Sequence, residues 1–142
     1  MKSAMNMVQA FHTLVDIQPG RKIVDRVLRI KLLHEEYVEY LEAEASSDIV
    51  AILDALADMV VIICGTALKY ELPLAAAFLE VMHNNMTKVG PDGKVLRRDD
   101  GKIMKPEGYK PVDLIPILEA YGWNERKRLS FKNSGRVQLI AP

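Results

Sequence analysis

Five carboxylates stand in two segments whose composition predicts helices, at spacings that bring them onto common helix faces. They are Glu35, Glu36, Glu39, Asp54 and Asp58. At about 100° per residue, Glu35 and Glu39 lie about 40° apart around a helix, and so do Asp54 and Asp58. Glu36 lies about 60° from Glu39 and can reach the same place. Because ionised carboxylates on an otherwise apolar face are costly unless a positive group meets them, the pattern predicts a cation site.

The chemistry of these side chains favours magnesium or manganese. Several oxygen ligands from two antiparallel helices suit a hard divalent cation, and we expect more than one ion per site. Zinc is disfavoured, since His34-Glu35 is not followed by a second histidine four residues on. Paired metals would lower the pKa of a bound water and leave one carboxylate free as the general base. The alternative is that the acids are surface salt-bridge partners.

Two long helices must position the acids. Residues 22–45 lack proline and glycine, and their apolar stripe runs on into the acidic positions. Residues 46–48 form a helix N-cap signal. The segment 49–71 that follows is nearly continuous apolar sequence. A helix that is apolar on all sides is expected to be buried on all sides.

The remaining elements complete an all-α antiparallel bundle of about four to five helices. Apolar spacing predicts a short amphipathic helix over 1–16, a helix from 73 to 88 and another over 112–121. Residues 123–142 are basic and are interpreted as a tail that packs on a neighbour. No composition break divides the chain, so we expect a single domain over 1–142.

A long basic loop is predicted between residues 89 and 111, with turn sequences at 90–93 and 99–101 and a small hairpin. Its cations, together with a polar helix end just before it, could hold phosphates beside the metals. The alternatives are a frayed helix end and a flexible, solvated loop. The candidate phosphate-binding residues are Asn85, Lys88, Lys94, Arg97 and Lys105.

Composition narrows the function classes further. A formal net charge of zero gives no basic field for a nucleic acid polymer. The single cysteine, Cys64, excludes an internal disulfide and is expected to be buried and inert. The longest apolar run, Met59–Cys64, is too short to span a bilayer, and we see no signal-peptide pattern. We therefore expect no membrane and a cytoplasmic location.

The acidic pattern Glu35-Glu36-x-x-Glu39, followed by Asp54-x-x-x-Asp58, resembles the signature of the all-α nucleoside triphosphate pyrophosphohydrolases. That superfamily includes MazG, the dimeric dUTPases and phosphoribosyl-ATP pyrophosphohydrolase. Its second half is usually Glu-x-x-Asp, whereas here Ala55 stands three residues before Asp58, and Asp54 is the alternative ligand. Later motifs resemble the MazG-like members common in phages, and the likeness covers about residues 8 to 114. These motifs are His83–Lys88, Gly90–Lys94, Asp100–Lys102 and Gly108–Leu114.

The resemblance implies Mg²⁺-dependent cleavage between the α- and β-phosphates of a nucleotide, giving a monophosphate and pyrophosphate. It implies that the acids at matching positions are metal ligands or the water-activating base, with Asp54 a further candidate ligand. Those positions are Glu35, Glu36, Glu39 and Asp58.

The resemblance also implies roles outside the acids. Asn85 and Lys88, helped by Lys94, Arg97 and Lys105 from the loop, would hold phosphate. Phe11 and His12 would border the base; the alternative is a core phenylalanine beside an exposed histidine.

Family members build their active sites in dimers or tetramers. A subunit interface of this kind agrees with the strongly apolar segment 49–68. The phage MazZ branch, which acts on dGTP and GTP, is the nearest likeness, and a phage-encoded enzyme would work in the host cytoplasm. Three alternatives stay open: a pyrophosphohydrolase for phosphoribosyl-ATP, dUTP or dCTP, a non-catalytic nucleotide-binding module, and a helical interaction protein.

Overall fold

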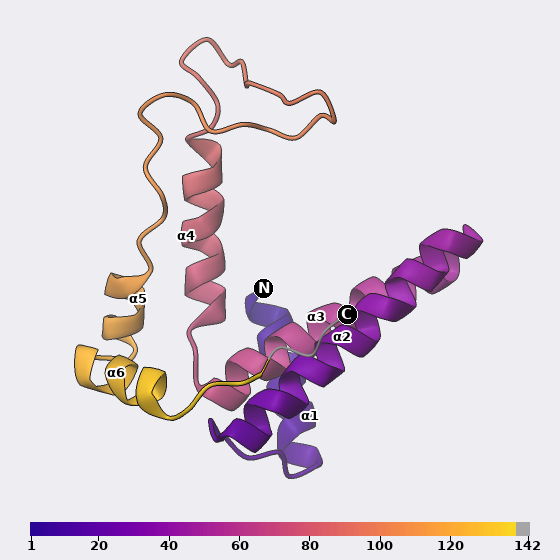
Figure 1. The fold of residues 1–142 in the computed structure, drawn as a ribbon, viewed down its shortest axis with the longest axis vertical. Coiled ribbons are helices and arrows are strands. Elements are labelled where there is room, and N and C mark those ends of the chain that lie inside the picture. Colours follow the sequence, from indigo (N-terminus) through magenta and orange to yellow (C-terminus); the bar gives the residue numbers. More distant parts are fainter. Residues whose placement is uncertain (139–142) are drawn as a thin grey trace. The chain divides into compact units, whose positions relative to one another are not determined.

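The computed structural model describes residues 1–138, and over this range the regular secondary structure is helical apart from one isolated antiparallel bridge between Arg97 and Ile103. The last four residues of the predicted tail, 139–142, lie outside the described part. The all-α prediction is confirmed, with one helix more than expected. The helices, labelled in Figure 1, are α1 (Lys2–Leu14), α2 (Ile23–Ser46), α3 (Ile49–Tyr70), α4 (Leu74–Met86), α5 (Ile115–Ala120) and α6 (Glu125–Asn133).

The chain folds into two compact units. The first contains residues 1–72 and the segment from Trp123 onward, and therefore helices α1, α2, α3 and α6. The second contains Pro73–Gly122, with α4, the long loop and α5. The single domain over 1–142 stays a prediction.

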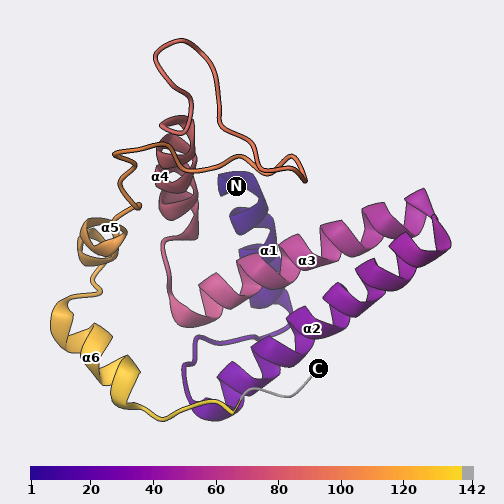
Figure 2. The same ribbon diagram turned by 45° about the horizontal axis from the view of Figure 1, so that its top comes forward.

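Helices α2 and α3 form an antiparallel hairpin and run side by side in both ribbon views (Figure 2). Only two residues connect them, and Ser47 turns the chain with a left-handed backbone (φ 55°). Asp48 then caps α3, because its side chain accepts hydrogen bonds from Val50 N at 3.0 Å and Ala51 N at 3.1 Å. The predicted N-cap is confirmed, and it fixes the closed end of the hairpin.

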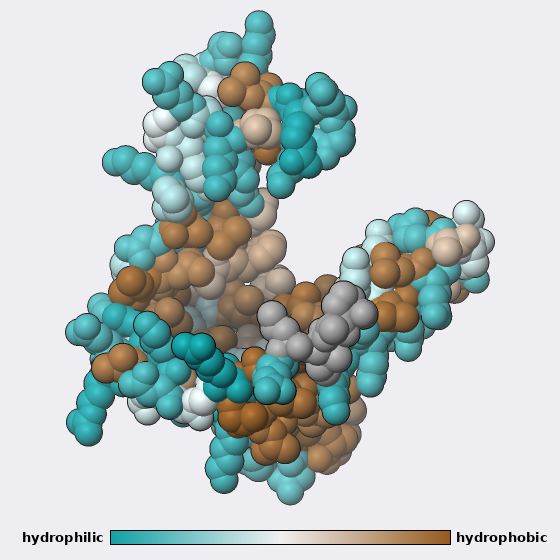
Figure 3. All heavy atoms as spheres, viewed as in Figure 1, coloured by the Kyte–Doolittle hydropathy of each residue, from teal (hydrophilic) through white to brown (hydrophobic). Residues whose placement is uncertain are grey.

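The prediction that α3 is buried on all sides is wrong for this single chain. Its small residues Ala55, Cys64 and Ala67 are buried, but Leu53 is 69% exposed. The reason is that helices of the same chain cover only the face that carries the small residues. Figure 3 shows apolar side chains on the visible surface of the hairpin. By length and composition alone α3 could also cross a membrane, a test that core helices of soluble proteins pass as well.

Helix α1 packs on α3 with the face that carries His12, and the face that carries Phe11 is left exposed. His12 is buried at 5% exposure, whereas Phe11 is 51% exposed, so the pair is the reverse of a core phenylalanine beside an exposed histidine. The physical reason lies at Gly65, where a Cβ atom would stand only 3.0 Å from His12 Nε2. The missing side chain makes room for the imidazole ring beneath α1.

Helix α6 was not anticipated within the predicted tail. Asn124 caps it by accepting a hydrogen bond from Lys127 N at 2.9 Å. Trp123, just before the cap, is buried and donates from Nε1 to Glu71 O at 2.9 Å. Phe131 on α6 meets the Trp123 ring edge-on, with centroids 5.9 Å apart. The C-terminal segment is thus part of the first unit's core.

The second unit consists of α4, the loop and a short α5 (Figure 1). The loop has the predicted turns, with Gly101 in a left-handed conformation (φ 87°) at the tip closed by the Arg97–Ile103 bridge. A glycine suits this position because a side chain would strain the backbone there. The predicted small hairpin is therefore present as a single antiparallel bridge around this turn.

Candidate functional site

The five predicted acids lie on the α2–α3 hairpin and are mostly open to solvent. Glu36 and Asp58 are half-buried, and the other three are exposed. Partial burial raises the pKa of Glu36, and so do the negative charges of its neighbours. In order of effect these neighbours are Glu39, Asp58, Glu35 and Asp54. The fold therefore brings acids from both helices into one electrostatic neighbourhood centred on Glu36.

The donor chemistry of this neighbourhood fits a hard divalent cation. All five groups offer carboxylate oxygens, and their mutual repulsion at Glu36 is what a cation between the helices would relieve. Over residues 1–138, however, no three acidic, histidine or cysteine side chains stand close enough together to form a finished metal cage. The ligand set therefore stays a prediction.

A buried polar cluster lies further along the same hairpin, and the sequence did not single it out. Arg29 on α2 is only 7% exposed, and its Nε donates to Thr66 Oγ1 at 2.9 Å. Its Nη2 donates to Ile62 O at 2.8 Å. Burial lowers the pKa of Arg29, and burial together with the charges of Arg29 and Lys69 lowers the pKa of His12. The feature of the sequence that could have indicated this buried cluster is Gly65, a glycine within an otherwise apolar helix.

The predicted phosphate-binding residues lie in the second unit, and two of them are joined directly. Lys88 Nζ donates to Asn85 Oδ1 at 2.8 Å, as their one-turn spacing implied. Lys88 and Lys105 both approach the ring of Tyr109, with Nζ 5.8 Å and 5.4 Å from its centroid. Tyr109 also donates a hydrogen bond to Asn84 Oδ1. Asn84 and Tyr109 also line a cavity of about 270 Å³.

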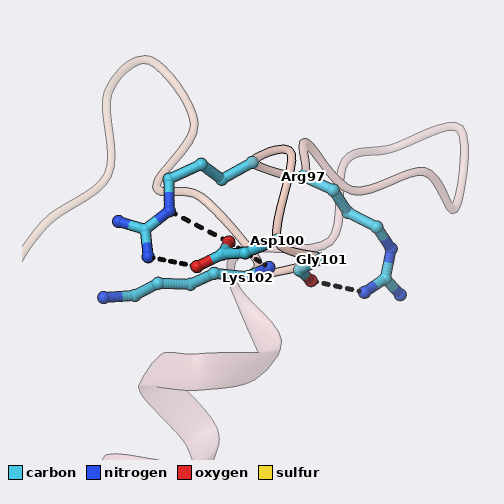
Figure 4. A network of polar contacts seen from close by, with 5 residues as sticks. Arg97, Asp100, Gly101 and Lys102 are labelled. Atoms are coloured by element: carbon cyan, nitrogen blue, oxygen red, sulfur yellow. Dashed lines mark hydrogen bonds and ion pairs between the residues drawn. The ribbon is translucent and has the colours of Figure 1, made fainter.

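The two other predicted loop cations are separate from this pair. Arg97 Nη1 donates to Gly101 O at 3.1 Å, and Figure 4 shows its side chain directed away from Asp100. Asp100 is instead paired with Arg98, which lowers the pKa of Asp100. Lys94 is exposed. The loop thus presents Arg97 and Lys94 to solvent near its turns.

Three expectations about the site stay predictions. The acids belong to the first unit and the phosphate-binding candidates to the second, so their action on one triphosphate is still an expectation. Phe11 is accessible for contact with a base. His12 is buried beside Arg29 and Gly65, so contact with a base would require α1 to move.

Comparison with known proteins gives one family. Residues 16–85 match the family model of phosphoribosyl-ATP pyrophosphohydrolase, a span that includes α2, α3 and nearly all of α4. A search of curated proteins finds no match. The matched span contains all five acids and Asn85, which are among the residues that carry the resemblance to this superfamily. Residues 16–85 are therefore a phosphoribosyl-ATP pyrophosphohydrolase-like domain of the all-α nucleoside triphosphate pyrophosphohydrolase superfamily.

Proposed function

We propose that the chain is a metal-dependent nucleoside triphosphate pyrophosphohydrolase, which converts a (d)NTP and water into a (d)NMP and pyrophosphate. The observation that carries the proposal is the gathering of acids from two antiparallel helices around Glu36. The family match over the same helices supports the reaction class. A divalent cation would relieve the repulsion among these carboxylates, and the phosphates of a nucleotide would bind the same cation.

The proposed metal is Mg²⁺ or Mn²⁺, with more than one ion per site. When bound, it would supply an activated water and neutralise charge on the phosphates. The residues that would hold it are Glu35, Glu36, Glu39, Asp54 and Asp58. One of the three glutamates, left free of the metal, accepts the proton of the attacking water.

The chain's cations would bind the phosphates of the substrate. Asn85 and Lys88 already form a bonded pair, and Lys105 lies over the same Tyr109 ring as Lys88. Lys94 and Arg97 would join them from the loop, and Phe11 would border the base, joined by His12 if α1 moves. We propose dGTP and GTP as the preferred substrates.

We also propose that the enzyme is a cytoplasmic homodimer or homotetramer that uses neither a membrane nor a nucleic acid polymer. The exposed apolar side chains of α2 and α3 support assembly, because surfaces of this kind are seldom left open to water. Val24, Leu53 and Ile49 are each about 70% exposed in the single chain. The charges of Asp54 and Asp58 in the middle of α3 favour a subunit interface over a lipid environment.

A second candidate substrate is phosphoribosyl-ATP, which the name of the matching family specifies. The reaction class would be the same, with cleavage between the α- and β-phosphates. Phosphoribosyl-ATP carries a triphosphate as well, so the cations of the basic loop of residues 89–111 suit both substrates and a substrate panel must separate them.

One substrate panel tests the proposal. Purified protein with Mg²⁺ or Mn²⁺ is incubated with all NTPs, all dNTPs and phosphoribosyl-ATP, and the products are resolved as mono- or diphosphates. We expect pyrophosphate and a monophosphate, and loss of both in Glu39→Gln and Asp58→Asn. Glu44→Gln, an exposed acid on α2 outside the cluster, is the matched control. Intact substrates throughout the panel would refute the proposed activity.

A further inference from the structure

Arg29 is a buried cation on α2 that makes no ion pair with the described residues. Its guanidinium instead bonds to α3, through Ile62 O and Thr66 Oγ1. Thr66 Oγ1 in turn donates to Ile62 O at 2.8 Å, so the three groups form a closed set. A buried charge without a carboxylate partner costs stability relative to an apolar side chain of similar size. Its contribution to the fold must therefore be geometric.

Polar contacts hold the hairpin at its closed end, at Arg29 and, nearer its open end, through the Asp25–Lys69 ion pair at 3.1 Å. The first is the two-residue turn, where Ser47 and Asp48 hold the closed end. The second is Arg29, which lies 18 residues earlier than Ser47 and so about 27 Å from it along the axis of α2. All five acids lie between the turn and Arg29. Two helices joined at one end can separate at the other. Of the two polar contacts that restrain the open end, Arg29 is the buried one and the one nearer the acids.

The same contact specifies which residues face each other across the hairpin. In antiparallel helices, opposed positions rise in number on one helix as they fall on the other. Arg29 lies opposite Ile62 and Thr66. Seven residues further along α2, Glu36 therefore lies opposite residues 55–59, which include Asp58. This agrees with Asp58 being among the charges that act on Glu36.

Gly65 and His12 complete the arrangement from α3 and α1. A Cβ at residue 65 would stand 2.7 Å from Arg29 Nη2 and 3.0 Å from His12 Nε2. Both side chains therefore occupy the space that the glycine leaves, and helix α1 covers the guanidinium. Such enclosure leaves the guanidinium few alternative positions, as a residue that fixes helix register requires.

We propose that Arg29 is a positioning residue, whose bonds to Ile62 and Thr66 hold α2 and α3 in the register that places Glu36 beside Asp58. The assignment of the acids to metal rests on the proposed function, whereas the register itself does not. In this role Arg29 acts through its bonds to α3 and the geometry of the hairpin.

The first measurement is the affinity for Mn²⁺ alone, followed by electron paramagnetic resonance. Arg29→Met keeps the length of the stem and removes the guanidinium; we expect Mn²⁺ to bind about 10–100-fold more weakly, the range for residues that orient metal ligands. Thr66→Val should weaken binding to a smaller extent, and Thr66→Ser, which keeps the acceptor, should not. Arg29→Lys, with one compact ammonium group, should rescue part of the loss.

Val8→Ala serves as the control for general destabilisation. Val8 is a buried core residue on α1 that makes no polar contact with the Arg29 cluster among the described residues. We expect it to lower the melting temperature while Mn²⁺ affinity stays within about twofold, since the hairpin register is unchanged. Equal losses of affinity in Val8→Ala and Arg29→Met would overturn the proposal.

The second measurement gives the distance between α2 and α3 directly and needs no metal. Spin labels are placed at Lys31 and Ile63, exposed positions near the Arg29 end of α2 and α3, and labelled protein is diluted with unlabelled chain. We expect a single narrow distance distribution in the parent and a longer, broader one with Arg29→Met. An unchanged distribution would overturn the proposal. If the parent binds no Mn²⁺ and hydrolyses no nucleotide, the proposed function fails, and the distances alone still decide the role of Arg29.

Discussion

Replacing Gly65 with alanine tests the packing of the buried polar cluster by the sign of its effect. In an ordinary helix, Gly→Ala stabilises by about 1 kcal/mol. Here the new Cβ would stand 2.7 Å from Arg29 Nη2 and 3.0 Å from His12 Nε2, so both side chains must shift. Overpacking costs about 1–3 kcal/mol, and losing the Arg29–Ile62 bond costs about 1.5–3 kcal/mol.

After the helix-propensity gain is subtracted, we expect Gly65→Ala to destabilise the protein by about 1.5–5 kcal/mol, with a central value of about 3 kcal/mol. For a chain of this length the central value corresponds to a fall in melting temperature of roughly 10 °C. Urea unfolding and differential scanning calorimetry measure the two quantities at neutral pH. Ala57→Gly, at an exposed position on the same helix, calibrates the propensity term at about 1 kcal/mol.

A rise in melting temperature for Gly65→Ala would refute the reasoning, because it would show that no side chains occupy the space beside the glycine. The double variant with Arg29→Met sharpens the test. Without the guanidinium, the clash at Nη2 is absent, so the cost of Gly65→Ala should be smaller in that background. Equal costs in the two backgrounds would show that Arg29 does not contact residue 65.

Three further predictions concern charge and packing. The pKa of Glu36 in the folded state is raised above 4.5, so the folded state binds this proton more tightly and the stability of the metal-free protein should fall as pH rises above 4.5. In urea titrations with EDTA, Glu36→Gln should reduce this dependence of stability on pH. An unaltered dependence would contradict the acid cluster. His12 has a folded pKa lowered below 6.5, so stability should fall as pH drops below 6.5, and His12→Gln should remove that dependence. Trp123→Ala should cost about 3–5 kcal/mol, because the indole is 4% exposed, whereas Tyr121→Ala, at an exposed ring, should stay within about 0.5 kcal/mol; similar losses for both would argue against a buried Trp123.

Local signals explain why the helices carrying the acids could be predicted from sequence. Residues 22–45 contain no helix breaker, and Asp48 offers a cap that the structure uses. The spacing of the acids is a property of each helix by itself. The resemblance to the pyrophosphohydrolases that this spacing indicated agrees with the family match over residues 16–85. Features encoded within one or two helical turns are visible without knowledge of the fold.

Features that depend on contacts between distant segments were not visible. Arg29 looks like any solvated cation until Thr66, 37 residues away, meets it. His12 and Phe11 are neighbours whose burial is decided by the gap at Gly65, not by their own hydropathy. Helix α6 was missed because its buried anchor, Trp123, finds its acceptor at Glu71, 52 residues earlier. In each case the deciding partner lies far along the chain.

The two-residue connection between α2 and α3 has a consequence for the order of folding. All the acids lie within one stretch of chain from residue 35 to 58, joined by a turn that closes with little loss of entropy. Contacts between segments so near in sequence form fast, and during synthesis this hairpin leaves the ribosome before the loop and the Trp123 anchor. The acidic half of the proposed site is thus the first part of the molecule able to fold.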